Sequence, residues 1–228
     1  MKNTFEVSGN LYQPEKNTTH YDENCVEPRI PVILKWIGTG KKVLDVGCYD
    51  GFYSKMIADL GNEVYGLEAN KDAVKKALEN GIKVKEADIE SKFPFKTGYF
   101  DIVYAGEVIE HLYDTDTFVN ECSRVLKKGG LFVITTPNTV SLPRRMLYLI
   151  GKGRFFEASN TFSTEGFSVG HIRFFTKDLL RDFIQSFGFE LLEFTSDYVN
   201  FPFFTSKLLA KIKPTFGRSL IMKFKKVN

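Results

Sequence analysis

A glycine-containing loop with two acidic residues lies early in the chain. It reads Asp45-Val46-Gly47-Cys48-Tyr49-Asp50-Gly51, and it directly follows the β-branched segment 42–46. Loops that follow the strands of a parallel sheet are the usual ligand-binding positions of α/β folds. The position and composition of this run therefore predict a ligand-binding site.

The glycine spacing and the charge of this loop indicate the type of ligand. A dinucleotide fingerprint would have glycines at 47, 49 and 52, whereas the chain has Tyr49 and Phe52 at two of these positions. The carboxylates of Asp45 and Asp50 would also repel a pyrophosphate. S-adenosylmethionine (AdoMet) has no phosphate and carries a sulfonium and an ammonium cation. An acidic loop of this kind therefore favours AdoMet.

Further acidic residues follow two later segments that read as strands. Glu68 follows the segment 63–67, about twenty residues past the loop, where such folds place a carboxylate on ribose hydroxyls. Ala69 adjoins it in the same expected site. Asp88 follows the segment 82–86, and its carboxylate is expected to accept a hydrogen bond from an adenine amino group. Ile89 is expected to pack on the adenine ring.

Together these markers resemble the class I AdoMet-dependent methyltransferases. The resemblance covers roughly residues 30–198 and implies a doubly wound, mostly parallel, seven-stranded α/β sheet with a reversed last strand. The motifs that carry it are Val43–Gly51, Glu68, Asp88 and Leu126-Lys127-Lys128-Gly129-Gly130-Leu131.

The resemblance also implies roles for individual residues. Asp45, Gly47 and Gly51 would line the methionine end of the cofactor, with Cys48 and Tyr49 between them. The family often has glycine at the position of Tyr49, which is the one departure in the loop. The positions implied beside the sulfonium are Ala105, Gly106 and Glu107.

A second cluster of reactive side chains is the run Glu107-Val108-Ile109-Glu110-His111. Glutamates three residues apart, followed by a histidine, can converge on one side of a helical turn. Such a set suits a divalent metal: oxygen donors favour Mg²⁺, Ca²⁺ or Mn²⁺, and histidine admits Zn²⁺ or Fe²⁺. His171, in the run Gly170-His171-Ile172-Arg173-Phe174-Phe175, is a candidate ligand from a distant part of the chain.

This run resembles two methyltransferase groups, the ubiquinone-pathway O-methyltransferases and the enzymes that methylate the terminal 2′-hydroxyl of small RNAs. In both, a Glu-x-x-Glu-His run is associated with a bound divalent metal. The resemblance implies a metal held by Glu107, Glu110 and His111, while His171 matches by order and by the aromatic run and helix after it. Two alternatives stay open: His111 acts as a general base without metal, or it only packs at a helix start.

Alternating strand and helix patterns position these residues. The alternation predicts a parallel sheet with helices on both faces. Residues 141–170 interrupt it and predict an insertion or lid. Its aromatic residues are expected either to shape an apolar pocket or to form the ordinary core of a small subdomain: Phe155, Phe156, Phe162 and Phe167, with Phe174 and Phe175 after it. The expected strands are 42–46, 63–67, 82–86, 99–105, 131–135, 189–198 and 218–227, and the expected helices are 28–37, 52–60, 71–79, 115–126 and 176–187.

The composition is that of an ordinary globular protein. The chain has 228 residues, 43% hydrophobic residues and a net charge of +3. This size predicts one globular domain over residues 41–228 with an N-terminal cap over residues 1–40, and the resemblance implies that the domain is a methyltransferase. The chain lacks a signal-peptide pattern and a run long enough to cross a bilayer, and its cysteines are odd in number and far apart. These features favour reduced thiols and a cytoplasmic location.

Basic and aromatic residues dominate the C-terminal segment. Beyond Asn200 there is no Asp or Glu, and residues 203–213 predict an amphipathic basic helix. Such a helix suits peripheral contact with an anionic membrane, whereas a nucleic-acid partner has no accompanying motif. The alternative is that the lysines are solvated and the aromatic side chains complete the core.

The leading functional hypothesis is an AdoMet-dependent O-methyltransferase for a small or lipid-like acceptor. Its catalytic candidates are Glu107, Glu110 and His111. One alternative is an RNA 2′-O-methyltransferase that uses the same metal site. The other is a non-catalytic AdoMet-binding regulatory domain. The motif set identifies the methyl donor and leaves the acceptor open.

Overall fold

A seven-stranded sheet organises the computed structural model, which describes residues 27–153 and 170–227. The strand order is β3-β2-β1-β4-β5-β9-β6. The last strand pairs antiparallel with both of its neighbours, while the pairs among the first five strands are parallel. The predicted α/β sheet with a reversed last strand is thus confirmed. The strands are β1 (Lys42–Val46), β2 (Glu63–Glu68), β3 (Lys83–Glu86), β4 (Phe100–Gly106), β5 (Leu126–Pro137), β6 (Phe189–Thr195) and β9 (Ser219–Lys226).

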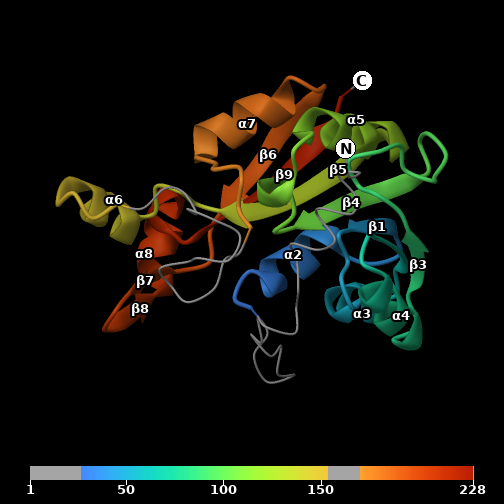
Figure 1. Cartoon of the computed structure of the whole chain (residues 1–228), viewed down its shortest axis with the longest axis horizontal. Coiled ribbons are helices and arrows are strands. Elements are labelled where there is room, and N and C mark those ends of the chain that lie inside the picture. The colour runs from blue at the N-terminus through green and yellow to red at the C-terminus, as the bar shows by residue number, and fades with distance from the viewer. Residues whose placement is uncertain (1–26, 154–169, 228) are drawn as a thin grey trace, which may run out of the picture.

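Helices cover both faces of this sheet (Figure 1). On one face α2 (Ile30–Ile37), α3 (Phe52–Asp59) and α4 (Lys71–Glu79) pack against the strands. On the other lie α5 (Thr115–Val125) and α7 (Lys177–Gln185). Alternate residues of the buried strands feed the two cores: Val43 packs with α2 and α3, whereas Leu44 and Val46 pack with α5 and α7.

Side-chain caps account for several helix starts. Asn70 accepts hydrogen bonds from two backbone N–H groups at the start of α4, and Asp114 and Thr176 each accept one at the starts of α5 and α7. The helix predicted from residue 28 begins two residues later, at Ile30, with Arg29 as its N-cap residue. Because α2 packs directly on the sheet, this part of the expected N-terminal cap belongs to the domain core.

The C-terminal segment differs from its prediction. The helix expected over 203–213 is shorter, because residues 204–206 pair as a strand with residues 199–201. The Ser206 side chain then accepts a hydrogen bond from the backbone N–H of Leu209 and starts the helix there. The elements are β7 (Val199–Phe201), β8 (Phe204–Ser206), α8 (Lys207–Ile212) and the 3₁₀ turn η2 (Pro214–Phe216).

The expected insertion is described only in part. It begins with α6 (Leu142–Leu149), which carries Ser141 at its N-cap position and a proline in its first turn. Residues 1–26 and 154–169 lie outside the described part, and with them the predicted aromatic lid residues Phe155, Phe156, Phe162 and Phe167. Among the helices that the structure describes, none has the length and apolar character needed to span a bilayer.

Candidate functional site

The sheet register brings the predicted site residues to one edge. Val46 pairs with both Leu67 and Ala105, and Gly106 pairs with Thr135. The loops that leave β1, β2, β4 and β5 therefore emerge side by side at the carboxyl ends of these strands. This is the edge at which open α/β sheets bind ligands.

Close packing explains the glycines of the loop after β1. Gly47 has a φ of +72°, and a Cβ there would lie 2.6 Å from Cγ2 of Val108. Gly51 has a φ of +79° and would bring a Cβ within 3.1 Å of Ala77. Both positions therefore need the conformational freedom of glycine and its lack of a side chain.

Tyr49 occupies a left-handed backbone position with a φ of 49°. A non-glycine residue rarely adopts this conformation, which costs of order 1–3 kcal/mol where the surroundings enforce it. The departure noted in the sequence thus falls where glycine would be unstrained. The backbone N–H of Tyr49 donates to Glu68 Oε2 at 3.0 Å, which helps to hold this conformation.

Glu68 joins the loops that follow β1 and β2. Its Oε2 accepts from Tyr49, and its Oε1 accepts from the backbone N–H groups of Ala69 and Asn70, both at 2.8 Å. Burial raises the pKa of Glu68, and the backbone hydrogen bonds oppose that rise. The backbone N–H groups of Gly47 and Cys48 meanwhile donate to Leu67 O at 2.7 and 3.3 Å. The predicted ribose carboxylate is thus a fixed part of the loop scaffold.

Asp45 lies inside the loop scaffold with only 3% of its surface exposed. Its Oδ2 accepts a hydrogen bond of 2.6 Å from the equally buried hydroxyl of Ser54 on α3. Burial raises the pKa of Asp45 to about 7, although the Ser54 hydrogen bond works in the other direction. The structure therefore places this carboxyl group against α3, at the end of β1.

A pH-dependent stability follows from Asp45. Its ordinary pKa is 3.8 and its folded pKa is about 7, so between these values the folded protein binds more protons than the unfolded chain. The free energy of unfolding should therefore fall as pH rises through this window, by up to about 1.4 kcal/mol per pH unit from this group. Asp45→Asn should remove that contribution in urea denaturation followed from about pH 4 to 7. Asp59→Asn, at an exposed position, is the control, and parallel pH profiles for Asp45→Asn and the unaltered protein would contradict the assignment.

The remaining cofactor candidates lie on the neighbouring strand ends. Asp88 follows β3, where its Oδ1 accepts from the backbone N–H of Glu90 at 2.8 Å and its Oδ2 accepts from the Ser91 hydroxyl at 3.2 Å. Its carboxylate is thus engaged in its own turn, and Ile89 is half-buried against the core. Ala105 is fully buried in β4 and Gly106 ends that strand.

Three of the four predicted metal ligands come together. One ligand atom from each of Glu110, His111 and His171 lies within 4.8 Å of the others. Glu110 and His111 belong to the 3₁₀ turn η1 (Ile109–His111) that follows β4. The rings of His111 and His171 have their centroids 4.8 Å apart.

Glu110 is buried, with 1% of its surface exposed. Its Oε2 accepts a 2.9 Å hydrogen bond from the hydroxyl of Thr136 on β5. Its Oε1 has no hydrogen-bond partner among residues 27–153 and 170–227, and His171 Nε2 lies 3.9 Å from it. Burial, together with the nearby Glu107 carboxylate, raises the pKa of Glu110 well above its ordinary range. A buried, unsatisfied carboxyl oxygen costs about 1–3 kcal/mol or more, and a bound cation would remove that cost.

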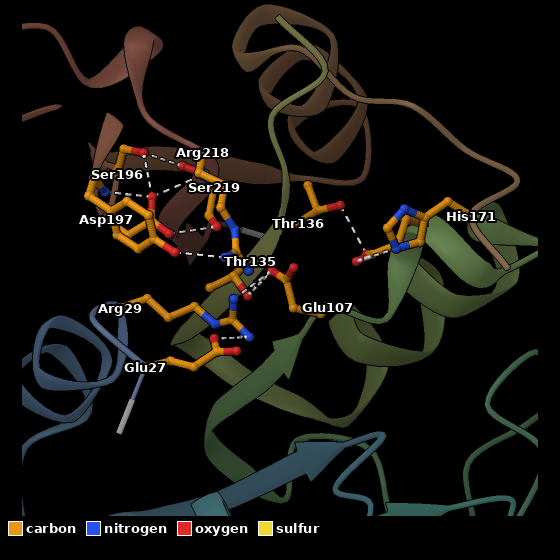
Figure 2. A network of polar contacts seen from close by, with 12 residues as sticks. Glu27, Arg29, Glu107, Thr135, Thr136, His171, Ser196, Asp197, Arg218 and Ser219 are labelled. Atoms are coloured by element: carbon orange, nitrogen blue, oxygen red, sulfur yellow. Dashed lines mark hydrogen bonds and ion pairs between the residues drawn. The ribbon is translucent and has the colours of Figure 1, made fainter. Parts of the chain in front are cut away.

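His171 is positioned by backbone hydrogen bonds that join distant parts of the chain. The N–H groups of Ile172 and Arg173 both donate to Glu110 O, at 2.9 and 3.0 Å. The Arg173 guanidinium donates to Leu112 O and Tyr113 O at 3.2 and 2.5 Å. The segment after Gly170 is thus attached along η1, and His171 comes to lie beside Glu110. Figure 2 shows His171 on the same side of the strand end as Thr136.

Glu107 lies outside this three-residue cluster. Its backbone is left-handed with a φ of 57°, and its Oε1 accepts a 2.9 Å hydrogen bond from the Thr135 hydroxyl. The same oxygen lies 3.6 Å from Nη1 of Arg29. As Figure 2 shows, Arg29 points toward Glu107, with Glu27 beside it.

Arg29 is a residue that the sequence patterns did not single out. It is 4% exposed, its Nη2 lies 2.5 Å from Glu27 Oε2, and its Nε has no hydrogen-bond partner in the described part of the chain. Burial works to lower the pKa of Arg29, but Glu107 and Glu27 outweigh burial and raise it. The hydroxyls of Thr135 and Thr136 were likewise missed, although two polar β-branched residues at the end of a buried strand are a usable signal.

Comparison with known proteins agrees with this geometry. A family model described as a methyltransferase domain matches residues 44–134. A ubiquinone biosynthesis O-methyltransferase of Xanthomonas oryzae is 31% identical over 157 residues, which cover 60% of this chain and 66% of that protein. A probable S-adenosylmethionine-dependent methyltransferase of Mycolicibacterium smegmatis is 35% identical over 104 residues, or 45% of this chain and 40% of that protein.

The chain belongs to the class I AdoMet-dependent methyltransferases. AdoMet is the cofactor of this family, in agreement with the prediction from the acidic loop. The fold agrees as well, since a SAM-dependent methyltransferase structure from Methanosarcina mazei has a TM-score of 0.65 at 18% identity, covering 86% of this chain and 97% of that one. The chain spans about half the length of the first curated relatives that it matches.

Proposed function

We propose that this methyltransferase transfers a methyl group from AdoMet to a hydroxyl oxygen of a small or lipid-like acceptor. The observation that carries the proposal is the unsatisfied Oε1 of Glu110, buried beside two imidazoles at the carboxyl edge of the sheet. A hydroxyl is a poor nucleophile unless its proton is removed or its pKa is lowered. This cluster offers a means of doing either at the edge where the cofactor loops meet.

The donor set fits a first-row divalent metal such as Mn²⁺, Fe²⁺ or Zn²⁺. One carboxylate and two imidazoles are ligands that these ions accept, and the orphaned Glu110 oxygen is a donor that lacks a partner in the described residues. Such a metal, when bound, would lower the pKa of an acceptor hydroxyl. Glu110, His111 and His171 would hold it.

Neighbouring groups orient these three side chains. Thr136 fixes one oxygen of Glu110, so that the other faces His171. His111 Nδ1 lies 3.2 Å from Gly170 O. In the tautomer that makes this hydrogen bond, Nδ1–H donates to the carbonyl and Nε2 keeps its lone pair for a ligand or a proton. The same tautomer serves His111 as a general base if no metal binds.

The relatives support an oxygen acceptor. Proteins named ubiquinone biosynthesis O-methyltransferase from Paraburkholderia phymatum and Bordetella avium are 35% and 33% identical over about half of this chain. The methyltransferase family model runs from residue 44 to 134, a range that includes the loops after β1, β2 and β4. These names support O-methylation as the reaction class.

Replacement of Glu68 by alanine should weaken AdoMet binding strongly. The carboxylate accepts hydrogen bonds from three backbone N–H groups of the loops after β1 and β2, and it lies at the end of β2, where this fold is expected to bind the ribose. Loss of a hydrogen-bonded charge in a buried site costs about 2–5 kcal/mol, which is roughly 30-fold or more in affinity. Isothermal titration with AdoMet and with S-adenosylhomocysteine measures the effect.

Glu63→Ala is the matched control for Glu68→Ala, because Glu63 lies in the same strand, at its other end. The control should bind AdoMet as the unaltered protein does. If Glu68→Ala, folded by circular dichroism, kept its affinity, the ribose role would be wrong.

An acceptor screen with labelled AdoMet tests the proposed reaction. Phenols, lipid-like alcohols and short RNAs are offered with and without a chelator. If a hydroxyl acceptor is labelled and the chelator suppresses this labelling, the metal-assisted reaction is supported. If the chelator leaves the labelling unchanged, His111 is supported as the general base. Transfer to nitrogen or carbon acceptors alone would overturn the proposal. Transfer to RNA that falls steeply with salt would assign the 2′-O-methyltransferase alternative.

A further inference from the structure

A small group of elements projects from one end of the sheet. It consists of α6, the β7–β8 hairpin and α8, which lie together at the left of Figure 1. The hairpin is held by three cross-strand pairs, and the rings of Phe201 and Phe204 stack with centroids 4.8 Å apart. Tyr148 and Arg145 of α6 donate to Thr139 O and Val140 O, which fixes that helix to the end of β5.

Large apolar side chains on these elements are exposed. Phe203, in the turn between β7 and β8, is 98% exposed, and Leu208 and Ile212 of α8 are 66% and 71% exposed. Leu149 and Ile150, at the end of α6, are 86% and 65% exposed. Single exposed apolar residues are common, but a concentration of them on neighbouring elements marks an interaction surface.

The charge of the same elements has one sign. Residues 138–153 and 198–227 contain no Asp or Glu. Lys207, Lys211 and Lys213 lie in or beside α8, Arg144 lies in the first turn of α6, and Lys152 follows the apolar end of that helix. Basic side chains beside exposed Phe, Leu and Ile are the pattern of proteins that rest on an anionic membrane surface.

The other possible occupants fit this pattern less well. A second copy docked symmetrically would bring the same basic residues face to face, with no acidic residue of either segment to neutralise them. A nucleic acid would use the lysines and the ring of Phe203, but the exposed leucine and isoleucine side chains offer its bases no stacking surface. The aliphatic and aromatic mixture favours the boundary between lipid headgroups and acyl chains.

We propose that α6, the β7–β8 hairpin and α8 form a docking surface for an anionic lipid bilayer, with Phe203, Leu208 and Ile212 inserting among the lipids. The lysines of α8 attract the headgroups. The proposal concerns a partner and does not rest on methyl transfer. The surface is nevertheless connected to the candidate metal cluster through β5. Thr136 of β5 donates a hydrogen bond to Glu110, and α6 is the next element after β5.

Vesicle flotation tests this surface without cofactor, metal or acceptor. The full chain should float with vesicles of phosphatidylcholine mixed with phosphatidylglycerol, should float less as salt is raised, and should stay unbound with phosphatidylcholine alone. Phe203→Ser combined with Leu208→Ser should reduce binding at least about tenfold, and Lys207→Glu with Lys211→Glu should do the same. Leu78→Ser, at a 54% exposed position on α4, is the matched control and should bind normally.

Several outcomes would overturn the proposal. One is equal binding to neutral and anionic vesicles, and another is unchanged binding of both double variants. A concentration-dependent dimer in analytical ultracentrifugation that Phe203→Ser abolishes, without vesicle binding, would assign the surface to a second copy. Binding to RNA in place of vesicles would assign it to nucleic acid. Thermal unfolding of each variant shows whether it is folded. AdoMet titration of the same samples tests the cofactor site separately, so a failure of the membrane proposal can be told apart from a failure of the proposed methyl transfer.

Discussion

Glu110→Ala is expected to abolish divalent-metal binding while leaving AdoMet binding intact. Within the described residues, the cluster consists of Glu110, His111 and His171, and Glu110 supplies its only carboxylate. The Oε1 atom of Glu110 has no hydrogen-bond partner in that part of the chain. Loss of even an outer-shell group costs a metal site about 10- to 100-fold in affinity, so loss of this ligand should cost about 100-fold or more. His111→Ala and His171→Ala are expected to have effects of the same order.

Titration with Mn²⁺ and Zn²⁺, together with elemental analysis after metal supplementation, measures this prediction. Glu107→Gln is the informative comparison, because Glu107 faces Arg29 and Thr135 and lies outside the cluster. We expect it to weaken the metal less than tenfold, which is less than a ligand would. Glu79→Ala on α4 is exposed and serves as the neutral control. The absence of a stoichiometric metal in the supplemented, unaltered protein would end the metal hypothesis and leave His111 as the candidate general base.

Arg29→Met is expected to destabilise the fold by about 3–5 kcal/mol. Arg29 is almost fully buried between Glu27 and Glu107, so a neutral side chain would leave both carboxylates without their cation. Burial already raises the pKa of Glu27, while Arg29 works to lower it. Removing one partner of a buried ion pair costs more stability than replacing both partners by neutral residues. A triple variant with Arg29→Met, Glu27→Gln and Glu107→Gln should therefore be more stable than Arg29→Met alone.

Urea denaturation at neutral pH gives the free energies for these variants. Lys35→Met, on the solvent side of α2, changes the same charge at an exposed position and should lie within about 0.5 kcal/mol of the unaltered protein. A destabilisation by Arg29→Met of no more than this would show that the ion pairs contribute nothing net. A full loss of stability in the triple variant would instead assign the effect of Arg29 to packing.

Much of the scaffold was predictable from local patterns. The helix 71–79 and the strand 42–46 have the predicted bounds, because alternating apolar residues, side-chain caps and glycine ends act over a few neighbouring residues. The acidic loop, Glu68 and the Glu-x-x-Glu-His run were found in the same way. The carboxyl ends of parallel strands lie along the same edge of the sheet, so residues that directly follow these strands must lie close together there.

The C-terminal segment shows the limit of local patterns. Residues 203–213 have the amphipathic spacing of a helix, yet residues 204–206 pair with β7 and only the remainder is helical. A hairpin depends on a partner strand and on the turn at Phe203, and neither appears in the periodicity of the helix itself.

The sequence by itself determined the fold class and the methyl donor and predicted the loop that binds it, because these depend on short-range spacing and on charge. The tertiary structure alone decided which candidates meet. It brought His171 to Glu110 through backbone hydrogen bonds between segments about sixty residues apart, and it turned Glu107 toward Arg29. Such contacts arise from packing between distant elements. No local pattern encodes them, and they set the composition of the candidate metal cluster.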